Sequence, residues 1–245
     1  MRASDLSPRP EPARLLLAAM ALAATITTTV ACTEKGGVDT APHTGDTGEP
    51  ASTDTSPCGA WTGYDVRGAE WSYAWVSGSI SGLGTTTLLD VDATGGAAST
   101  RTVLAYEDVD YTYTITVSTS YVCDAEGLWV GTQSTDWVTV TGDYTSTDWL
   151  LTTFDPPWLA LQRDAEEGST WVGNTHRSVQ GSAVASSEAD LTYSMAAALD
   201  TVTVPAGSFD ALRVDVSGDL GLTSWYAAGV GLVKTGDLQL NARTP

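Results

Sequence analysis

Two-residue alternation is the feature of this sequence that most constrains its fold. The clearest example is the segment Y-T-Y-T-I-T-V-S-T-S-Y-V-C, which spans residues 111–123. Its large apolar side chains share one face of an extended chain: Tyr111, Tyr113, Ile115, Val117 and Tyr121. Threonine and serine occupy most of the other face. Because side chains alternate across a strand, this pattern predicts a strand with one packed face and one wet face.

The same period recurs over most of the chain from residue 58 onward. W-S-Y-A-W places Trp71, Tyr73 and Trp75 on one face, and further strands are expected near Trp137, Thr201 and Ala211. Gly- and Asp-rich stretches separate these segments, and helical periodicity is nearly absent. Only the segment 190–199 fits a short helix as well as a strand. The pattern therefore predicts an all-β domain over residues 58–245, built as a single antiparallel sheet.

A faint internal repeat divides this predicted domain. G-A-E-W at residues 68–71 recurs as G-S-T-W at residues 168–171. Tyr121 precedes Gly127-Leu128 by six residues, and Trp225 precedes Gly231-Leu232 by the same interval. The two offsets, 100 and 104 residues, nearly agree. Two hypotheses remain open, a duplicated β-meander and coincidence in a chain rich in glycine and tryptophan.

Residues 1–31 have the composition of a signal peptide. Arg2, Arg9 and Arg14 precede an uncharged run over residues 15–31. That run is shorter than the ~20 residues that a membrane-spanning helix needs. The sequence therefore predicts export.

The end of this run resembles the lipobox of bacterial lipoproteins, in which a peptidase cuts before a cysteine that carries diacylglycerol. Val30 and Ala31 fit the pattern, whereas Thr29 stands where leucine is preferred. The resemblance implies lipidation of Cys32 and anchoring to the outer membrane or cell surface, with the periplasmic face as an alternative. Secretion with cleavage near Ala31, or an uncleaved anchor helix, would also fit the run.

Residues 32–57 consist mainly of glycine, threonine, aspartate, serine and proline. Such a segment cannot bury enough apolar surface to offset the entropy lost on ordering. We therefore expect a flexible tether between Cys32 and the β domain.

The cysteine count agrees with lipidation of Cys32. The chain has three cysteines, and exported proteins tend to pair their thiols or to use them. With Cys32 lipidated, Cys58 and Cys123 remain for one disulfide. Two free buried thiols are the alternative.

The net charge and the glycine motifs exclude several partners. The chain has 30 acidic and 11 basic residues, a formal charge of −19, so charge attraction to nucleic acid is not expected. W-Y-A-A-G-V-G-L-V-K, residues 225–234, lacks the spacing of a nucleotide-binding loop, and a turn and strand follow it rather than a helix. We interpret it as a hairpin with bends at Gly229 and Gly231, in which Lys234 pairs with a carboxylate. No nucleotide or cofactor is expected.

The sequence offers no set of catalytic or metal-binding residues. His176 is the one histidine in the predicted domain, and no Gly-x-Ser-x-Gly accompanies it. D-V-D-A-T-G at residues 90–95 begins like a calcium loop, but Arg101 stands where the bidentate glutamate belongs. The adjacent pair Glu166 and Glu167 would point in opposite directions in a strand. The sequence therefore predicts neither an enzyme nor a metal site.

Three longer motifs carry a resemblance. V-T-V-P-A-G-S-F-D-A-L-R-V, W-Y-A-A-G-V-G-L-V-K and D-P-P-W-L-A-L, together with G-S-T-W, resemble the shared text of uncharacterised exported bacterial proteins, many of them lipoproteins. Ala228 stands where that group often has proline. The resemblance implies a strongly curved antiparallel sheet, an incomplete barrel similar to the lipoprotein carriers of the bacterial envelope. It implies no catalytic residues.

The aromatic residues leave the function open between two classes. The chain has nine tryptophans and nine tyrosines against two phenylalanines. Trp71, Tyr73 and Trp75 could line a hollow, form a sugar-stacking platform or fill a core. We predict a lipid-anchored, non-enzymatic envelope protein that binds an apolar small molecule or an envelope protein, or serves as an interaction module. The alternative is a cell-surface carbohydrate-binding module.

Overall fold

The computed structural model describes residues 58–244, except residues 65, 78–79, 93–95, 108–109 and 183. The described residues form twelve β-strands: β1 (Glu70–Ser77), β2 (Ile80–Val91), β3 (Ala97–Glu107), β4 (Thr112–Cys123), β5 (Gly127–Thr141), β6 (Tyr144–Gln162), β7 (Thr170–Gly181), β8 (Ser187–Val204), β9 (Gly207–Gly218), β10 (Leu222–Ala227), β11 (Gly231–Thr235) and β12 (Leu238–Thr244). The prediction of an all-β antiparallel fold is confirmed, and the segment 190–199 is part of β8. Cys32, the signal sequence and the tether lie outside the described residues.

The sheet closes into a barrel. Each strand pairs with its neighbours in sequence, and β1 also pairs with β12, from Glu70 opposite Thr244 to Trp75 opposite Leu238. The prediction of an incomplete barrel is therefore wrong. Pairing of the first and last strands gives both of them backbone partners that a sheet edge lacks. Alternation along each strand could not indicate that these two distant segments meet.

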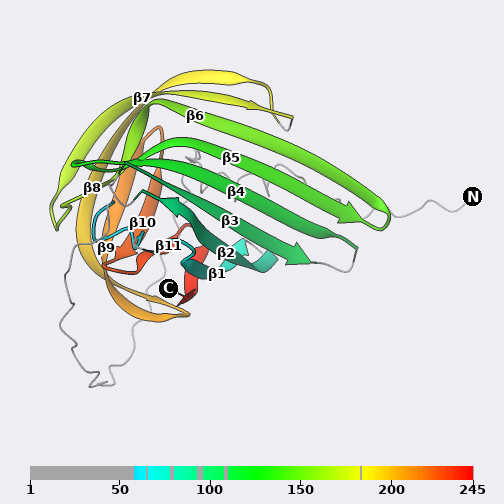
Figure 1. Cartoon of the computed structure of the whole chain (residues 1–245), viewed down its shortest axis with the longest axis horizontal. Coiled ribbons are helices and arrows are strands. Elements are labelled where there is room, and N and C mark those ends of the chain that lie inside the picture. The colour runs from blue at the N-terminus through cyan, green and yellow to red at the C-terminus, as the bar shows by residue number, and fades with distance from the viewer. Residues whose placement is uncertain are drawn as a thin grey trace, which may run out of the picture.

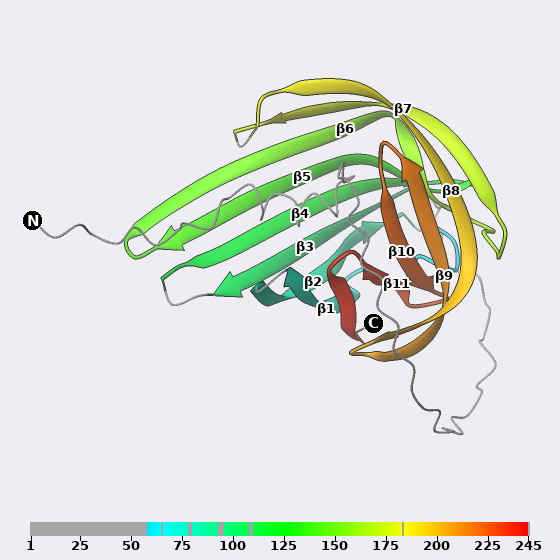
Figure 2. The ribbon, with the colours of Figure 1, turned by 180° about the vertical axis from the view of Figure 1, so that it is seen from behind.

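The barrel wall is uneven in length. β6 has 19 residues and β11 has five, which correspond to roughly 60 Å and 17 Å at the rise of an extended chain. Figure 1 shows β3–β6 as a broad wall, and Figure 2 shows β9 and β10 on the opposite side. The long strands therefore extend beyond the section in which the barrel is closed.

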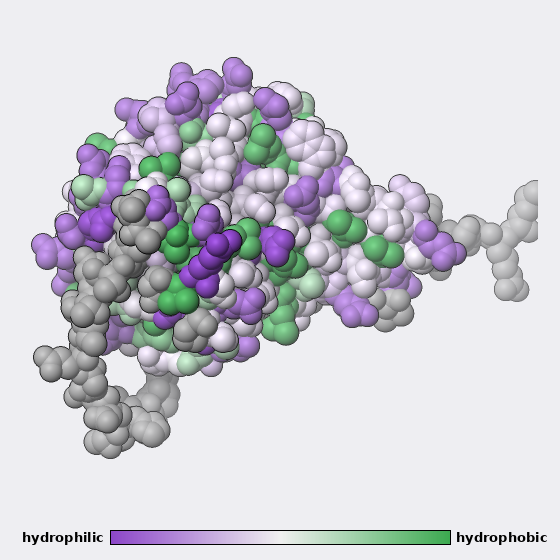
Figure 3. Space-filling model, in the orientation of Figure 1, coloured by the Kyte–Doolittle hydropathy of each residue, from purple (hydrophilic) through white to green (hydrophobic). Residues whose placement is uncertain are grey.

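The predicted alternation places the apolar face inside. Ile115 and Val117 are 1% exposed, whereas Ser118 and Thr116 between them are half-buried on the outer side. The same holds on β1, where Trp71, Tyr73 and Trp75 are buried. On the face shown in Figure 3, hydrophilic residues surround a group of apolar residues near the middle. Burial of the inner face is the main source of stability for such a sheet.

The sequence repeat extends to the backbone hydrogen bonds. Gly68 and Gly168 both have positive φ, of 88° and 85°, just before β1 and β7. Gly68 N–H donates to Leu88 O at 2.8 Å, and Gly168 N–H donates to Ala197 O at 2.9 Å. Leu88 and Ala197 each donate back to the residue after the glycine. The halves β1–β6 and β7–β12 thus begin with the same arrangement.

Strand register extends this equivalence through five strands of each half. Trp71 lies opposite Thr86, which lies opposite Thr102; Trp171 lies opposite Met195, which lies opposite Val216. By the same registers the corresponding pairs are Thr86 and Met195, Thr102 and Val216, Thr100 and Val214, Thr119 and Ser224, and Gln133 and Thr235. This register supports the hypothesis of two similar meanders.

Residues 58–69, which we call the floor, cover one end of the barrel. Gly229 N–H donates to Ala60 O at 2.9 Å, and the Trp61 indole donates to Ala165 O at 3.0 Å. Gly63 has a φ of 64° and lies directly against the backbone of Val230, so a side chain there would clash. The floor is therefore fastened to turns at the β6–β7 and β10–β11 connections.

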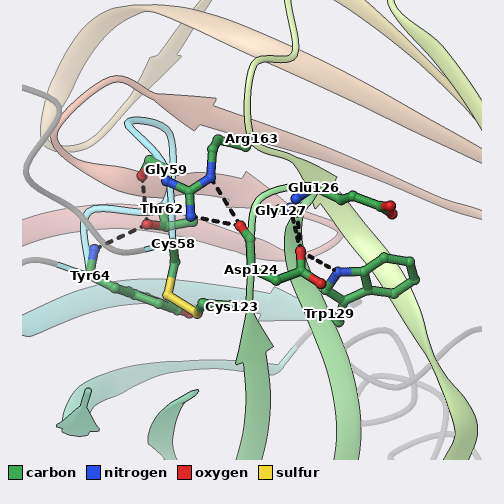
Figure 4. The surroundings of a disulfide bond; sticks show 10 residues. All are labelled: Cys58, Gly59, Thr62, Tyr64, Cys123, Asp124, Glu126, Gly127, Trp129 and Arg163. Carbon is green, nitrogen blue, oxygen red and sulfur yellow. Dashed lines mark hydrogen bonds between the residues drawn. A yellow bond between two sulfur atoms is a disulfide. The ribbon is translucent and has the colours of Figure 1, made fainter. Parts of the chain in front are cut away.

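A disulfide fastens the floor to β4. Cys58 and Cys123 are bonded, with an S–S distance of 1.97 Å, which confirms the predicted pairing. Figure 4 shows that the next turn is also held by polar contacts. Arg163 donates to Asp124 O at 3.0 and 2.7 Å, and Asp124 accepts from the Trp129 indole at 2.9 Å. These contacts fix the end of the barrel at which the described chain begins.

Candidate functional site

A cavity of about 130 Å³ lies inside the barrel above the floor. It is lined from β1–β6 and β10–β12, with Tyr64 of the floor. The lining residues are Tyr64, Trp71, Tyr73, Thr86, Thr100, Thr102, Thr119, Tyr121, Leu128, Val130, Gln133, Phe154, Trp158, Ala160, Leu222, Ser224, Tyr226, Leu232, Thr235 and Leu238. None comes from β7, β8 or β9, whose inner faces are packed with apolar side chains such as Met195 and Val214.

The aromatic residues predicted as ligand contacts lie inside the barrel. Trp71, Tyr73 and Trp75 are 2%, 3% and 2% exposed. Trp71 and Tyr73 line the cavity, and Trp75 belongs to the adjoining core. The Trp71 indole donates to Val230 O at 2.6 Å, and the Tyr73 hydroxyl donates to Leu232 O at 2.9 Å. Both polar groups are thus engaged with the backbone, and their rings form an apolar wall.

A bend in β6 brings Trp158 into the cavity wall. Two consecutive prolines, residues 156–157, cannot donate hydrogen bonds to a neighbouring strand. Accordingly, pairing with β5 skips from Thr153 to Trp158, and pairing with β7 ends at Asp155 opposite His176. Trp158 then stacks edge-on against Phe154 at a centroid distance of 6.2 Å. The D-P-P-W motif is the signal that sequence analysis quoted without recognising its place at the cavity.

Side chains from β7 and β8 replace the missing backbone pairing at this bend. The Thr175 hydroxyl donates to Pro156 O at 2.6 Å, and the Trp171 indole donates to Leu159 O at 3.1 Å. Leu159 N–H donates to the Tyr193 hydroxyl at 3.0 Å. The Tyr193 ring lies directly against Gly173, where no side chain obstructs it. The second half of the barrel thus closes the cavity on this side by packing.

A row of polar side chains lines the opposite wall. We call Thr86, Thr100, Thr102, Thr119 and Gln133 the polar row; its members come from β2, β3, β4 and β5. Thr86 and Thr102 share a hydrogen bond at 2.8 Å, and the Gln133 amide donates to Thr119 at 3.3 Å. On the other side of the cavity, Ser224 and Thr235 share the equivalent bond at 2.9 Å. The cavity therefore has an apolar wall and hydroxyl groups facing it.

Thr100 differs from the rest of the polar row. Its side chain is 3% exposed, yet no hydrogen bond joins its hydroxyl to any residue within the described ranges. Removing a hydroxyl from water without a partner costs about 1–3 kcal/mol in proteins. Sequence analysis missed the polar row, although Thr100 and Thr102 stand in phase with the buried Ala98 and Leu104.

The tyrosines around the cavity are neutral hydrogen-bonding groups. Burial raises the pKa of Tyr226 to about 12 and raises the pKa of Tyr64 and Tyr73 well above the usual range. Tyr64 also hydrogen-bonds to Tyr121, which further favours its protonated form. None of the lining residues is an acid, a histidine, a lysine or an arginine. The cavity is thus uncharged at neutral pH.

His176 lies on the outer wall, away from the cavity. Its Nδ1 lies 2.8 Å from Asp190 Oδ1, and its Nε2 lies 4.0 Å from Glu188. These carboxylates, with Asp155, raise the pKa of His176, the hydrogen bond to Asp190 being the main cause. The imidazole is exposed and belongs to a surface ion pair.

The decapeptide at residues 225–234 forms the β10–β11 hairpin. Gly229 and Gly231 have positive φ, of 69° and 96°, as the predicted bends require. Trp225 faces outward, and Tyr226 faces the cavity. The expectation that Lys234 pairs with a carboxylate is wrong: its ammonium lies over the Trp225 ring, 4.9 Å from the centroid. Among the described side chains, Arg213 instead pairs with Asp200 and Asp215.

Three further structural findings bear on the kind of site. Across the described ranges, no group of three or more His, Cys, Asp or Glu side chains could hold a metal ion. Glu166 and Glu167 are exposed in the turn before Gly168. The part of the chain that the structure describes contains no helix of sufficient length and hydrophobicity to cross a membrane.

Comparison of the chain with protein-family models, with curated proteins and with solved structures found no match.

Proposed function

We propose that this protein is a lipid-anchored protein of a bacterial envelope that binds a small, largely apolar molecule inside its barrel without converting it chemically. The observation that carries the proposal is the cavity itself. A closed wall surrounds about 130 Å³ of space lined mainly by aromatic and aliphatic side chains. Enclosed apolar pockets with a few polar groups are the usual form of small-molecule binding sites.

The export part of the proposal is supported by the lipobox resemblance around Cys32 and by the disulfide between Cys58 and Cys123. Disulfides persist in oxidising compartments such as the periplasm and the cell surface. A binding role is favoured over catalysis because the lining has no acid–base pair and no thiol.

The alternative of a carbohydrate-binding module has less support. A sugar platform requires aromatic rings that present their faces to solvent. Trp71, Tyr73 and Trp75 are buried, and Trp149 is an isolated half-exposed tryptophan on β6. The aromatic residues that suggested a platform line the barrel instead.

Native mass spectrometry of the purified protein tests the proposal. We expect a bound small molecule in the natural protein and its loss in Ala160→Phe, because Ala160 lines the cavity and phenylalanine would fill it. Ala196→Phe is the matched control, because Ala196 is exposed on the outer face of β8. A molecule retained by Ala160→Phe, or none in the natural protein, would contradict the proposal.

Detergent phase partitioning tests the anchor separately. Cys32→Ala should move the protein from the detergent phase to the aqueous phase, because the lipid would have no attachment site. Equal partitioning of the two proteins would remove the lipid anchor from the proposal and leave the binding site intact.

A further inference from the structure

We propose that the ligand is a small neutral molecule that combines one ring, or a chain of similar size, with a hydroxyl or carbonyl group. The polar group would contact Thr100, Thr102 and Thr86, and the apolar body would lie against Trp71 and Trp158. This inference rests on the proposed function, because it specifies what the cavity binds.

The volume of the cavity limits the size of the ligand. An apolar protein cavity of about 150 Å³ binds benzene, and the present cavity is about 130 Å³. A molecule with one six-membered ring therefore fits. A diacyl lipid does not fit, because each of its chains alone exceeds this volume.

The absence of charged side chains from the lining limits the charge of the ligand. A carboxylate or ammonium group that leaves water loses its hydration, and in this cavity it would find no opposite charge. The phenols cannot supply one, because the pKa of Tyr64, Tyr73 and Tyr226 is raised and all three remain protonated. A neutral ligand avoids this penalty.

The two halves of the barrel indicate which polar groups serve the ligand. Thr119 with Gln133 corresponds to Ser224 with Thr235, and each pair makes the same internal hydrogen bond. Those four groups are thus part of the framework that both halves share.

Thr86, Thr102 and Thr100 instead correspond to Met195, Val216 and Val214. The three threonines line the cavity and their three counterparts do not. The fold accepts apolar residues at these positions, so the hydroxyls are not needed to build the barrel. They are present only where there is space for a ligand.

The hydrogen-bonding capacity of this group is only partly used. Thr86 and Thr102 bond to each other at 2.8 Å, which engages one hydrogen of their two hydroxyls. The buried Thr100 hydroxyl makes no hydrogen bond to another described residue. A ligand hydroxyl or carbonyl beside Thr100 would supply a partner. The adjacent Trp71 and Trp158 rings provide the apolar surface that such a molecule would also need.

Calorimetric titration of the full chain with three probes tests this inference. The probes are p-cresol, which has a ring and a hydroxyl; toluene, which lacks the hydroxyl; and benzoate, which carries a charge. At neutral pH we expect p-cresol to bind more tightly than toluene and benzoate not to bind. Thr100→Val should weaken p-cresol about fivefold, the effect of one net hydrogen bond, and leave toluene unchanged.

Two variants serve as controls. Thr116→Val removes a hydroxyl from the outer face of β4 and should alter no affinity. Ala160→Phe should abolish binding of p-cresol and toluene. If neither neutral probe binds, or if both bind equally well to Ala160→Phe, the proposed function itself fails.

The inference alone fails under other outcomes. If Ala160→Phe abolishes binding but Thr100→Val leaves the ratio of p-cresol to toluene affinity unchanged, the cavity binds ligands without using the polar row. If benzoate binds as tightly as p-cresol, the cavity does not select neutral molecules.

Discussion

The two halves of this barrel share a strand register but line the interior differently. In β1–β6, the inner face of β2 and β3 carries Thr86, Thr100 and Thr102. In β7–β12, the corresponding strands β8 and β9 carry Met195, Val214 and Val216. The first set faces a cavity, whereas the second set is packed.

This difference separates the requirements of the fold from those of a site. Packed apolar side chains stabilise a protein by roughly 1.5–3 kcal/mol each when fully buried. Threonine at the same depth contributes less and requires a partner for its hydroxyl. A half that holds threonines where its counterpart holds valines has therefore given up stability at those positions. We infer that the first half is adapted to bind and the second half to hold the barrel closed.

Removal of the disulfide should have the largest effect on stability, because the disulfide fastens the floor to the first half. The bond closes a sequence separation of 65 residues, for which chain entropy predicts about 4 kcal/mol. Urea unfolding of the double variant Cys58→Ser with Cys123→Ser measures this loss.

Trp61→Phe provides the matching change on the second half, because it removes the hydrogen bond to Ala165 O. We expect it to lower the free energy of unfolding by about 1 kcal/mol. If Trp61→Phe proves more damaging than loss of the disulfide, the covalent link is not the main fastening of the floor.

A hydroxyl placed in the packed half should be the next most damaging change. Val214 is 1% exposed and corresponds to Thr100. Val214→Thr should lower the free energy of unfolding by about 2 kcal/mol, because the buried hydroxyl would have neither space nor partner. Denaturant unfolding measures the change, and a variant as stable as the natural protein would show that the halves do not differ in packing.

Separation of the hydroxyl pair in the first half should have a smaller effect. Thr102→Val removes the partner of Thr86 and should lower the free energy of unfolding by about 1 kcal/mol. Replacing both threonines by valine should restore most of the loss, because no unpaired group remains. A double-mutant cycle measures the coupling. Two losses that simply add would mean that the hydroxyls do not interact.

The pH response should also differ between the halves. The cavity lining has no group that titrates near neutrality, so p-cresol affinity should be constant between about pH 5.5 and 8. On β7, His176 has a raised pKa. Its stabilising contribution is therefore full below the ordinary histidine pKa and disappears as the pH rises through the raised value.

Titration by NMR with Asp190→Asn tests the cause of this shift. The variant should lower the pKa of His176, because the hydrogen bond to Asp190 is its main cause. An unchanged pKa would assign the shift to Glu188 and Asp155.

The sequence predicted the local elements of this structure well. Alternation over residues 111–123 located β4, and the pair of glycines in W-Y-A-A-G-V-G-L-V-K located the β10–β11 hairpin. The cysteine count predicted the bond between Cys58 and Cys123. Each of these inferences depends on residues that are close in sequence or few in number.

Closure of the barrel and the polar row were not predictable in the same way. Pairing of β1 with β12 joins segments at opposite ends of the domain, and no local pattern records it. Thr100 and Thr102 belong to the run S-T-R-T, whose composition is typical of a wet face. Only their phase relative to Leu104 indicated that they point inward. The offset of 100 residues between the two glycine motifs was the one long-range signal, and strand register was needed to interpret it.

The free energy of unfolding of Thr100→Val, measured without ligand, tests the central claim most directly. If the polar row serves a ligand and not the fold, valine should leave the stability unchanged within about 0.5 kcal/mol or increase it, as its counterpart Val214 indicates. A loss of more than about 1 kcal/mol would show that the Thr100 hydroxyl stabilises the barrel. The distinction between a binding half and a holding half would then be wrong.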